Sequence, residues 1–254
     1  MDQEGKFAKL RTFNIAMAIF HFCQAVAVLV LATDFKLPVT SSFLKFDPGS
    51  SSLLPNADTL FEVAIGPAVA VFLFLSAFAH ILIALPKINE WYNKNLAKGI
   101  NYARWIEYSF SSSLMIAVIA MLVGIYDISA LIAIFILNAT MILFGWMMEL
   151  HNQSTTKTDW TSFIFGCIAG IGPWVAIGIY LWSPGSDVKA PDFVYWIYFS
   201  IFLFFNSFAI NQVLQYKKVG RWKDYLYGER AYIVLSLVAK SLLAWQVFAG
   251  TLRP

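Results

Sequence analysis

The chain has 254 residues, of which 59% are hydrophobic, 17% aromatic and only 13% charged, and its net charge is +3. Soluble domains carry about 25% charged residues, so the composition excludes an ordinary soluble protein and indicates one that crosses a membrane repeatedly. The small net charge and the lack of a basic tract in the sequence argue against a nucleic-acid partner.

Seven apolar stretches are each long enough to cross a bilayer as a helix, which takes roughly 20 residues. We expect spans at about 11–33, 61–86, 100–124, 127–150, 160–182, 191–216 and 224–250. The first stretch exceeds a signal-peptide core and is expected to be retained. Cys23 and Cys167 fall inside apolar stretches and are expected to be buried thiols. The sequence therefore predicts an all-α, seven-transmembrane-helix bundle that forms a single domain over residues 1–254.

The connections between the spans differ in length. Residues 34–60 form the one long connection, with three prolines and a glycine among β-prone residues such as "VTSSFLKF". This pattern predicts a short β-ribbon. The other connections are short, including "GIYDIS" between the third and fourth spans and "SPGSDVKAPD" between the fifth and sixth.

The basic residues that flank the spans predict the orientation in the membrane. Of the 18 lysines and arginines, thirteen lie on one set of flanks, four lie on the opposite set, and Lys240 belongs to neither. Cytoplasmic loops carry the excess of Lys and Arg. We therefore expect a cytoplasmic N-terminus, an extracellular C-terminus and an extracellular ribbon.

Lys240 lies in the middle of the apolar stretch "AYIVLSLVAKSLLAWQVFAG". It is about 10 residues from the outer end of its span, or roughly 15 Å, which is too far for its side chain to reach the interface. A desolvated lysine amine is nucleophilic and suits Schiff-base formation with an aldehyde. A structural ion pair between helices explains the position equally well.

Glu107, about one-third into the third span, also needs a cation inside the membrane. Lys240 or a Schiff base made from it is the first candidate partner, and Arg104, three residues back on the same helix face, is the alternative. Ser111 and Ser236 lie one turn from Glu107 and Lys240, where their hydroxyls can bond this pair or their own helix backbone.

His21 and His80 lie on the cytoplasmic side of these residues in the first two spans. Histidines there can hold or relay a proton near neutral pH, although a lone buried histidine is usually only a core residue. No Cys/His spacing in the sequence resembles a metal site. Glycines such as Gly145 permit close helix packing or leave room for a ligand.

Several blocks closely resemble the heliorhodopsins, including "RWIEYSFSSSLM", "NATMILFGWMMEL" and "GERAYIVLSLVAKSLLAWQ". The resemblance covers nearly the whole chain and agrees with the inverted orientation. It implies all-trans retinal on Lys240 as a protonated Schiff base, with Glu107 as counterion and Ser111 and Ser236 in its network. The implied cofactor contacts are Lys240, Glu107, Ser236, Ser111, His21, His80, Tyr108, Met141, Gly145 and Phe205.

The resemblance further implies a light-sensing, non-enzymatic photoreceptor of the cell membrane with a slow photocycle. It also implies a homodimer that uses the ribbon, surrounded by membrane lipid. Span three carries no second carboxylate one or two turns beyond Glu107, which is the single well-placed membrane acid. This absence weakens the interpretation as an ion pump. A cytoplasmic signalling partner would read the basic segments 87–98 and 217–223. The alternatives are a light-driven or light-gated ion (proton) transporter, and a retinal-free membrane scaffold or enzyme.

Overall fold

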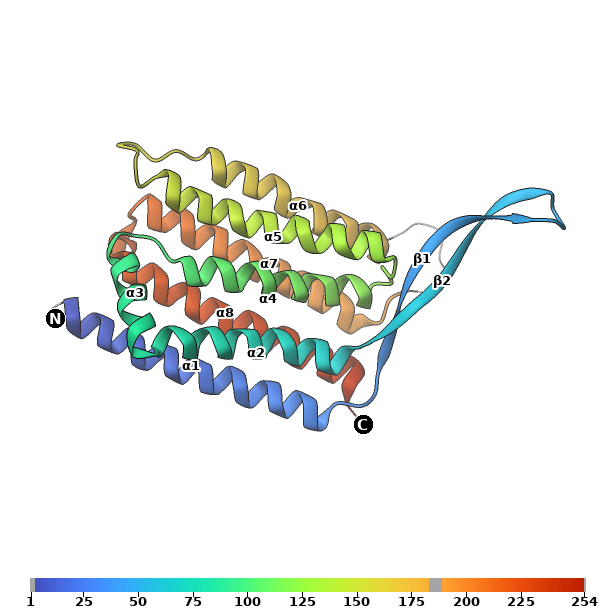
Figure 1. Ribbon diagram of the computed structural model, residues 1–254, viewed down its shortest axis with the longest axis horizontal. Coiled ribbons are helices and arrows are strands. Elements are labelled where there is room, and N and C mark those ends of the chain that lie inside the picture. The colour runs from blue at the N-terminus through green and yellow to red at the C-terminus, as the bar shows by residue number, and fades with distance from the viewer. Residues whose placement is uncertain (1–2, 183–188, 254) are drawn as a thin grey trace.

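The computed structural model describes residues 3–182 and 189–253 and shows long helices side by side, with a two-stranded ribbon projecting from one end (Figure 1). The helices and strands are α1 (Gln3–Leu31), β1 (Lys36–Asp47), β2 (Ser52–Ala64), α2 (Ile65–Ala84), α3 (Pro86–Ala97), α4 (Tyr102–Leu122), α5 (Ile128–His151), α6 (Thr161–Leu181), α7 (Asp192–Tyr216) and α8 (Tyr225–Val247). A 3₁₀ turn (Gly220–Lys223) precedes α8, and a π turn (Phe248–Leu252) extends it. In the described part of the chain, 7 helices are long and apolar enough to cross a membrane, which confirms the seven predicted spans.

The helix bounds differ from the predicted spans where local chemistry intervenes. α1 begins at Gln3 instead of residue 11, because the polar residues ahead of the apolar stretch continue the helix. α2 begins at Ile65 rather than 61, because β2 runs on to Ala64 without a connecting loop. Residues 183–188 of the predicted connection between the fifth and sixth spans lie outside the described residues.

The helix α3 lies at the end of the bundle opposite the ribbon and was not predicted (Figure 1). Leu85 has extended backbone angles, and Pro86 starts α3 at the first position, where its missing N–H costs nothing. Asn89, Tyr92 and Leu96 are its buried residues, at the spacing of one helix face. We refer to this end of the bundle as the α3 end and to the other as the ribbon end.

The predicted ribbon is confirmed and is longer than expected. β1 and β2 have 12 and 13 residues and pair antiparallel from Lys36–Ala64 to Asp47–Ser52, with an irregularity between Val39 and Thr40. The Thr40 amide donates a hydrogen bond of 2.8 Å to the Tyr126 carbonyl, in the turn between α4 and α5. The base of the ribbon is therefore fixed to the bundle.

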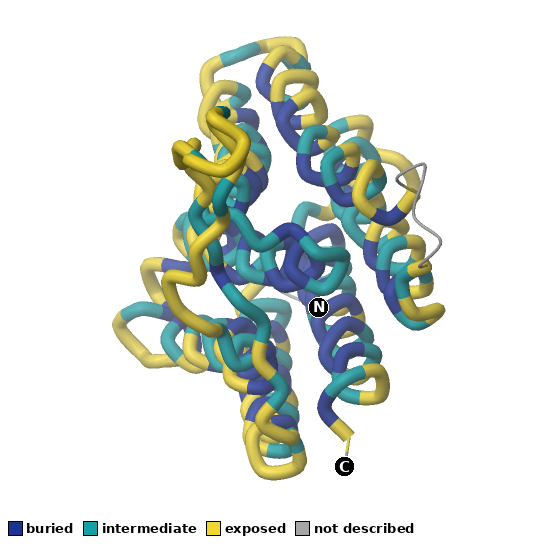
Figure 2. Tube along the Cα trace, turned by 90° about the vertical axis from the view of Figure 1, so that its right-hand side faces the viewer, coloured by how far each residue is buried: buried dark blue, intermediate teal, exposed yellow. Residues whose placement is uncertain are grey.

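The buried residues lie on the helix faces that are turned toward one another, and the outer faces are exposed (Figure 2). Large apolar side chains such as Phe20, Phe78 and Ile168 are 58%, 63% and 64% exposed, as expected for surfaces that contact lipid. The prediction of buried thiols is wrong, because Cys23 and Cys167 are both free and exposed. Cys23 lies beside the exposed Phe22, and Cys167 lies beside the exposed Ile168.

Candidate functional site

Lys240 on α8 is buried in the middle of the bundle, 3% exposed, and contacts side chains from two other helices. Its Nζ atom donates to Glu107 Oε1 on α4 at 2.7 Å and to Ser76 Oγ on α2 at 2.5 Å. Ser76 Oγ in turn donates to Glu107 Oε1 at 2.7 Å. The amine, the carboxylate and the hydroxyl therefore form a closed triangle of hydrogen bonds.

This triangle decides between the two partners considered for Glu107. Arg104 does not pair with Glu107, because its guanidinium faces two other carboxylates at the α3 end. A buried charge pair is kept only when both members are hydrogen-bonded, and removing one partner costs about 3–5 kcal/mol. Ser76 supplies that additional bond and was missed in the sequence, although it lies one helical turn from His80 on the same face of α2.

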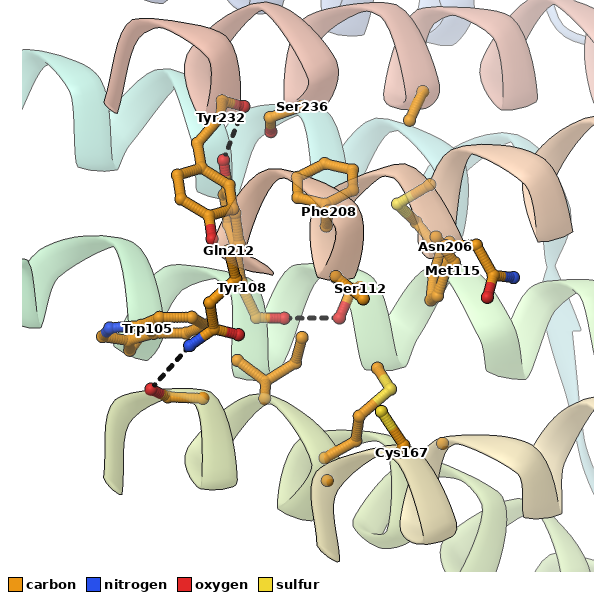
Figure 3. Close-up of a pocket in the computed structure, with 18 of the residues that line it drawn as sticks. Trp105, Tyr108, Ser112, Met115, Cys167, Asn206, Phe208, Gln212, Tyr232 and Ser236 are labelled. Atoms are coloured by element: carbon orange, nitrogen blue, oxygen red, sulfur yellow. Dashed lines mark hydrogen bonds between the residues drawn. The ribbon is translucent and has the colours of Figure 1, made fainter. Parts of the chain in front are cut away.

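A large apolar cavity of about 280 Å³ opens beside the Lys240 amine. Figure 3 shows labelled side chains from α4, α6, α7 and α8 pointing toward it, with Trp105, Met115 and Phe208 among them. Besides Lys240 and Glu107, the predicted retinal contacts on helices α4 to α8 are six residues. All six line this cavity: Tyr108, Ser111, Met141, Gly145, Phe205 and Ser236. Its volume lies near the lower end of the range for ligand pockets, about 300–1,000 Å³.

Two glycines on the cavity wall allow other side chains to take the space beside them. A Cβ atom at Gly145 would lie 2.5 Å from the Trp105 ring, and one at Gly170 would lie 2.4 Å from the Met141 sulfur. Glycine at these positions therefore lets large apolar side chains form a close-fitting wall. An apolar wall with one amine suits an apolar ligand that reacts with that amine.

Glu107 faces a second, smaller cavity of about 30 Å³, which is lined mainly by polar residues. His80 also lines it, and its Nδ1 atom lies 2.8 Å from the Asn14 Oδ1 atom. The rings of His80 and His21 are stacked with their centroids 5.7 Å apart, and neither nitrogen of the wholly buried His21 has a hydrogen-bond partner among the described residues. The two predicted histidines therefore come together on the Glu107 side. Asn14 was missed, although it lies two turns from His21 on α1.

The Lys240–Glu107 pair thus stands between an apolar cavity and a polar one. Lys240 lines the larger cavity, Glu107 lines the smaller, and Tyr108 lines both. The Tyr108 ring also lies 5.2 Å from the Lys240 Nζ atom, within the range of a cation–π contact.

The sequence suggests that Glu107 is the single well-placed membrane acid, but the bundle buries two further acids. Glu149 on α5 and Glu229 on α8 are each 1% exposed and both pair with Arg104, which is 6% exposed. Glu149 lies near the C-terminal end of α5 and Glu229 near the N-terminal end of α8, where charged side chains normally reach water. The helix ends are buried there because α3 and the Asn101 cap of α4 cover them.

Comparison with known proteins agrees with this site. No curated protein matches the chain. The profile of the heliorhodopsin family matches residues 10–252, which covers nearly all of the 254 residues and all seven apolar helices. Heliorhodopsins carry retinal as chromophore, which fits a buried lysine amine beside an apolar cavity. The chain therefore belongs to the heliorhodopsin family and is a multi-pass membrane protein.

Proposed function

We propose that the chain is a photoreceptor that holds all-trans retinal on Lys240 and signals without pumping ions. The observation that carries this proposal is the buried Lys240 amine, which pairs with Glu107 at 2.7 Å and borders an apolar cavity of about 280 Å³. Family membership supports a light-sensing retinal protein. The attachment at Lys240, the isomer and the signalling role are our proposals.

Retinal, bound to the Lys240 nitrogen as a protonated Schiff base, supplies light absorption and a change of shape on isomerisation. Glu107 and Ser76 hold a positive charge at this nitrogen in the dark. The aromatic and methionine side chains of the large cavity exclude water from the polyene side. On the other side, Glu107 and His80 line the small polar cavity and would take up a proton released from this nitrogen in the light.

The polar groups around the site lie mainly toward one end of the bundle, which favours a sensor. From Glu107 toward the α3 end the chain offers His80, Asn14 and Glu229 around one cavity. Toward the ribbon end, the wholly buried side chains among the described residues are apolar beyond Asn138 and Ser113, which bond each other at 3.0 Å. Toward that end the polar contacts of the described residues are half-buried pairs such as Ser200–Gln246, so this arrangement supports holding a proton on the α3 side rather than net transport.

We infer that the signal leaves at the α3 end. Tyr92 on α3 lines the same small cavity as Glu107 and His80, so a change of charge there reaches a helix on the bundle surface. The basic segments 87–98 and 217–223 flank this end and supply a surface for a cytoplasmic partner. This placement also assumes the cytoplasmic N-terminus expected from the charge distribution.

We further propose that the ribbon joins two copies in a homodimer. Its side chains Phe43, Leu44, Phe46, Leu53 and Leu54 are 46–66% exposed, and large exposed apolar patches mark interaction surfaces. Replacing Leu44 and Leu53 by serine should convert dimers to monomers in light scattering of the detergent-solubilised protein. A dimer that survives both replacements would assign the contact to another surface.

The proposed function is tested with purified protein and added all-trans retinal. The unsubstituted protein and a Lys45→Ala control should become coloured, and Lys240→Ala should stay colourless. Flash spectroscopy and photocurrents are then recorded on the same preparation in liposomes. Colour without current supports the sensor, a steady light-driven current supports the transporter, and no colour at all would refute both.

A further inference from the structure

The buried cluster at the α3 end has unequal charge. Arg104 pairs with Glu149 at 2.5 Å and also with Glu229, and the three side chains are 4%, 1% and 1% exposed. Within residues 3–182 and 189–253, no other cation forms an ion pair with either carboxylate. Two ionised carboxylates beside one guanidinium leave an uncompensated negative charge, which is strongly unfavourable in a buried site.

The groups that surround the two carboxylates do not balance this charge. Glu149 accepts hydrogen bonds from Tyr225 at 3.0 Å, the Asn101 amide at 3.0 Å and Trp105 Nε1 at 2.5 Å, and Glu229 accepts one from Asn101 Nδ2 at 2.6 Å. All these donors are neutral. Five tyrosines, which are neutral at pH 7, also face the pair: Tyr92 on α3, Tyr108 on α4, Tyr216 on α7, and Tyr225 and Tyr232 on α8. His80 and Glu107 face Glu229 across the small cavity, and the charge of Glu107 is already paired with Lys240.

We propose that Glu149 and Glu229 share one bound proton in the dark, so that the Arg104 cluster is a second proton-binding site of the protein. A single proton makes the cluster neutral with Arg104 charged. It leaves the hydrogen bonds from Arg104, Asn101 and Trp105 in place, because a carboxyl group retains acceptor oxygens when protonated.

The small polar cavity connects this second site to Glu107. Glu229, Arg104, His80 and Glu107 all line it, and its volume is about 30 Å³. A buried water needs about 10–15 Å³ and two to four polar partners, so the cavity accommodates a bridging water. The Nε atom of Arg104 is buried without a hydrogen-bond partner among the described residues and supplies a donor for that water. We therefore expect a water bound in this cavity to link the shared proton to Glu107.

This arrangement gives the cluster a role in the light response, which rests on the proposed function. When Glu107 or His80 takes up a proton, the charge on the cavity wall changes. The shared proton then shifts between the carboxylates or toward the cavity. The presence of the proton in the dark does not depend on retinal.

Infrared spectroscopy of the dark protein in an ester-free detergent tests the resident proton. We expect a C=O stretch of a protonated carboxyl that moves down in D₂O and on carboxyl-¹³C labelling of glutamate. The band should disappear in both Glu149→Gln and Glu229→Gln, because either change leaves Arg104 with one carboxylate. It should remain in Glu107→Gln and be displaced in Glu229→Asp. Absence of the band in the unsubstituted, folded protein overturns the proposal.

A light-minus-dark spectrum of the coloured protein tests the connection to Glu107. The same band should change on illumination, and the change should be absent in Glu149→Gln and Glu229→Gln. A dark band that light leaves unchanged overturns the connection and leaves the proton site standing. A dark band in a protein that never becomes coloured would refute the proposed function while supporting the second proton site.

Discussion

The Lys240 Nζ atom lies 2.5 Å from the Ser76 Oγ atom, and the same hydroxyl donates to Glu107 at 2.7 Å. Ser76 therefore contacts both members of the buried charge pair. It brings α2 into a site that α4 and α8 would otherwise form alone.

Replacing Ser76 by alanine should move the absorption maximum of the retinal-loaded protein to the red. The positively charged Lys240 nitrogen and Glu107 each lose their hydrogen bond with Ser76, so the charge is less strongly stabilised at the nitrogen. A hydrogen bond to a charged group contributes about 1.5–3 kcal/mol. The measurement is a visible spectrum at neutral pH. Thr12→Ala on the outer face of α1 is the control, since Thr12 bonds only its own helix backbone. An unshifted Ser76→Ala spectrum would show that the contact has no electronic effect.

Replacing Glu107 by glutamine should have a larger effect than the Ser76 change. The buried positive charge then loses its ionic partner, a cost of about 3–5 kcal/mol. We expect either a strong red shift or loss of the protonated chromophore at neutral pH. Glu90→Gln on α3 is the matched control on the exposed surface. Equal spectra for the two variants would remove Glu107 as counterion.

Replacing Gly145 by alanine should destabilise the protein and alter the apolar cavity. The new methyl group would lie 2.5 Å from the Trp105 ring, whose Nε1 atom donates to Glu149. Overpacking of this kind costs about 1–3 kcal/mol. The thermal midpoint and the amount of retinal bound are measured against Gly49→Ala, where the nearest atom would be 3.6 Å away. Normal stability and full retinal uptake would mean that Trp105 moves freely.

Replacing Asn14 by leucine should slow the return of the protein to its dark state after a flash. The His80 ring then loses its partner at 2.8 Å, and an unsatisfied buried polar group costs about 1–3 kcal/mol. The small cavity also loses a polar wall, so a proton is held there less well. Transient absorption in the microsecond-to-second range measures the recovery. Unchanged kinetics would place the proton acceptor away from His80.

The seven helices could be predicted because each apolar stretch is long enough to cross a bilayer. The Lys240–Glu107 contact was expected for a physical reason as well, since two opposite charges buried in neighbouring helices need each other. Ser76 and Asn14 could not be chosen in the same way. Single small polar residues occur in many spans, and only their position in the folded bundle distinguishes them.

The helix α3 and the Arg104 cluster were missed because both depend on long-range contacts. The sequence of α3 is polar, and its three buried residues become apparent only when the bundle covers them. Arg104 and Glu229 lie close to the ends of their helices, where charged residues normally reach water. Here α3 and Asn101 close that route, so charges that looked interfacial are buried.

The continuous segment from β2 through α2 to α3 has a mechanical consequence. β2 passes into α2 without a loop, α2 carries Ser76 and His80, and only Leu85 separates α2 from α3. The ribbon at one end of the bundle and the surface helix α3 at the other are thus both joined directly to α2. α2 contacts the charge pair through Ser76. We therefore expect a displacement of α2 at Ser76 to move both the ribbon and α3, and a partner bound to either one to change how easily the site moves.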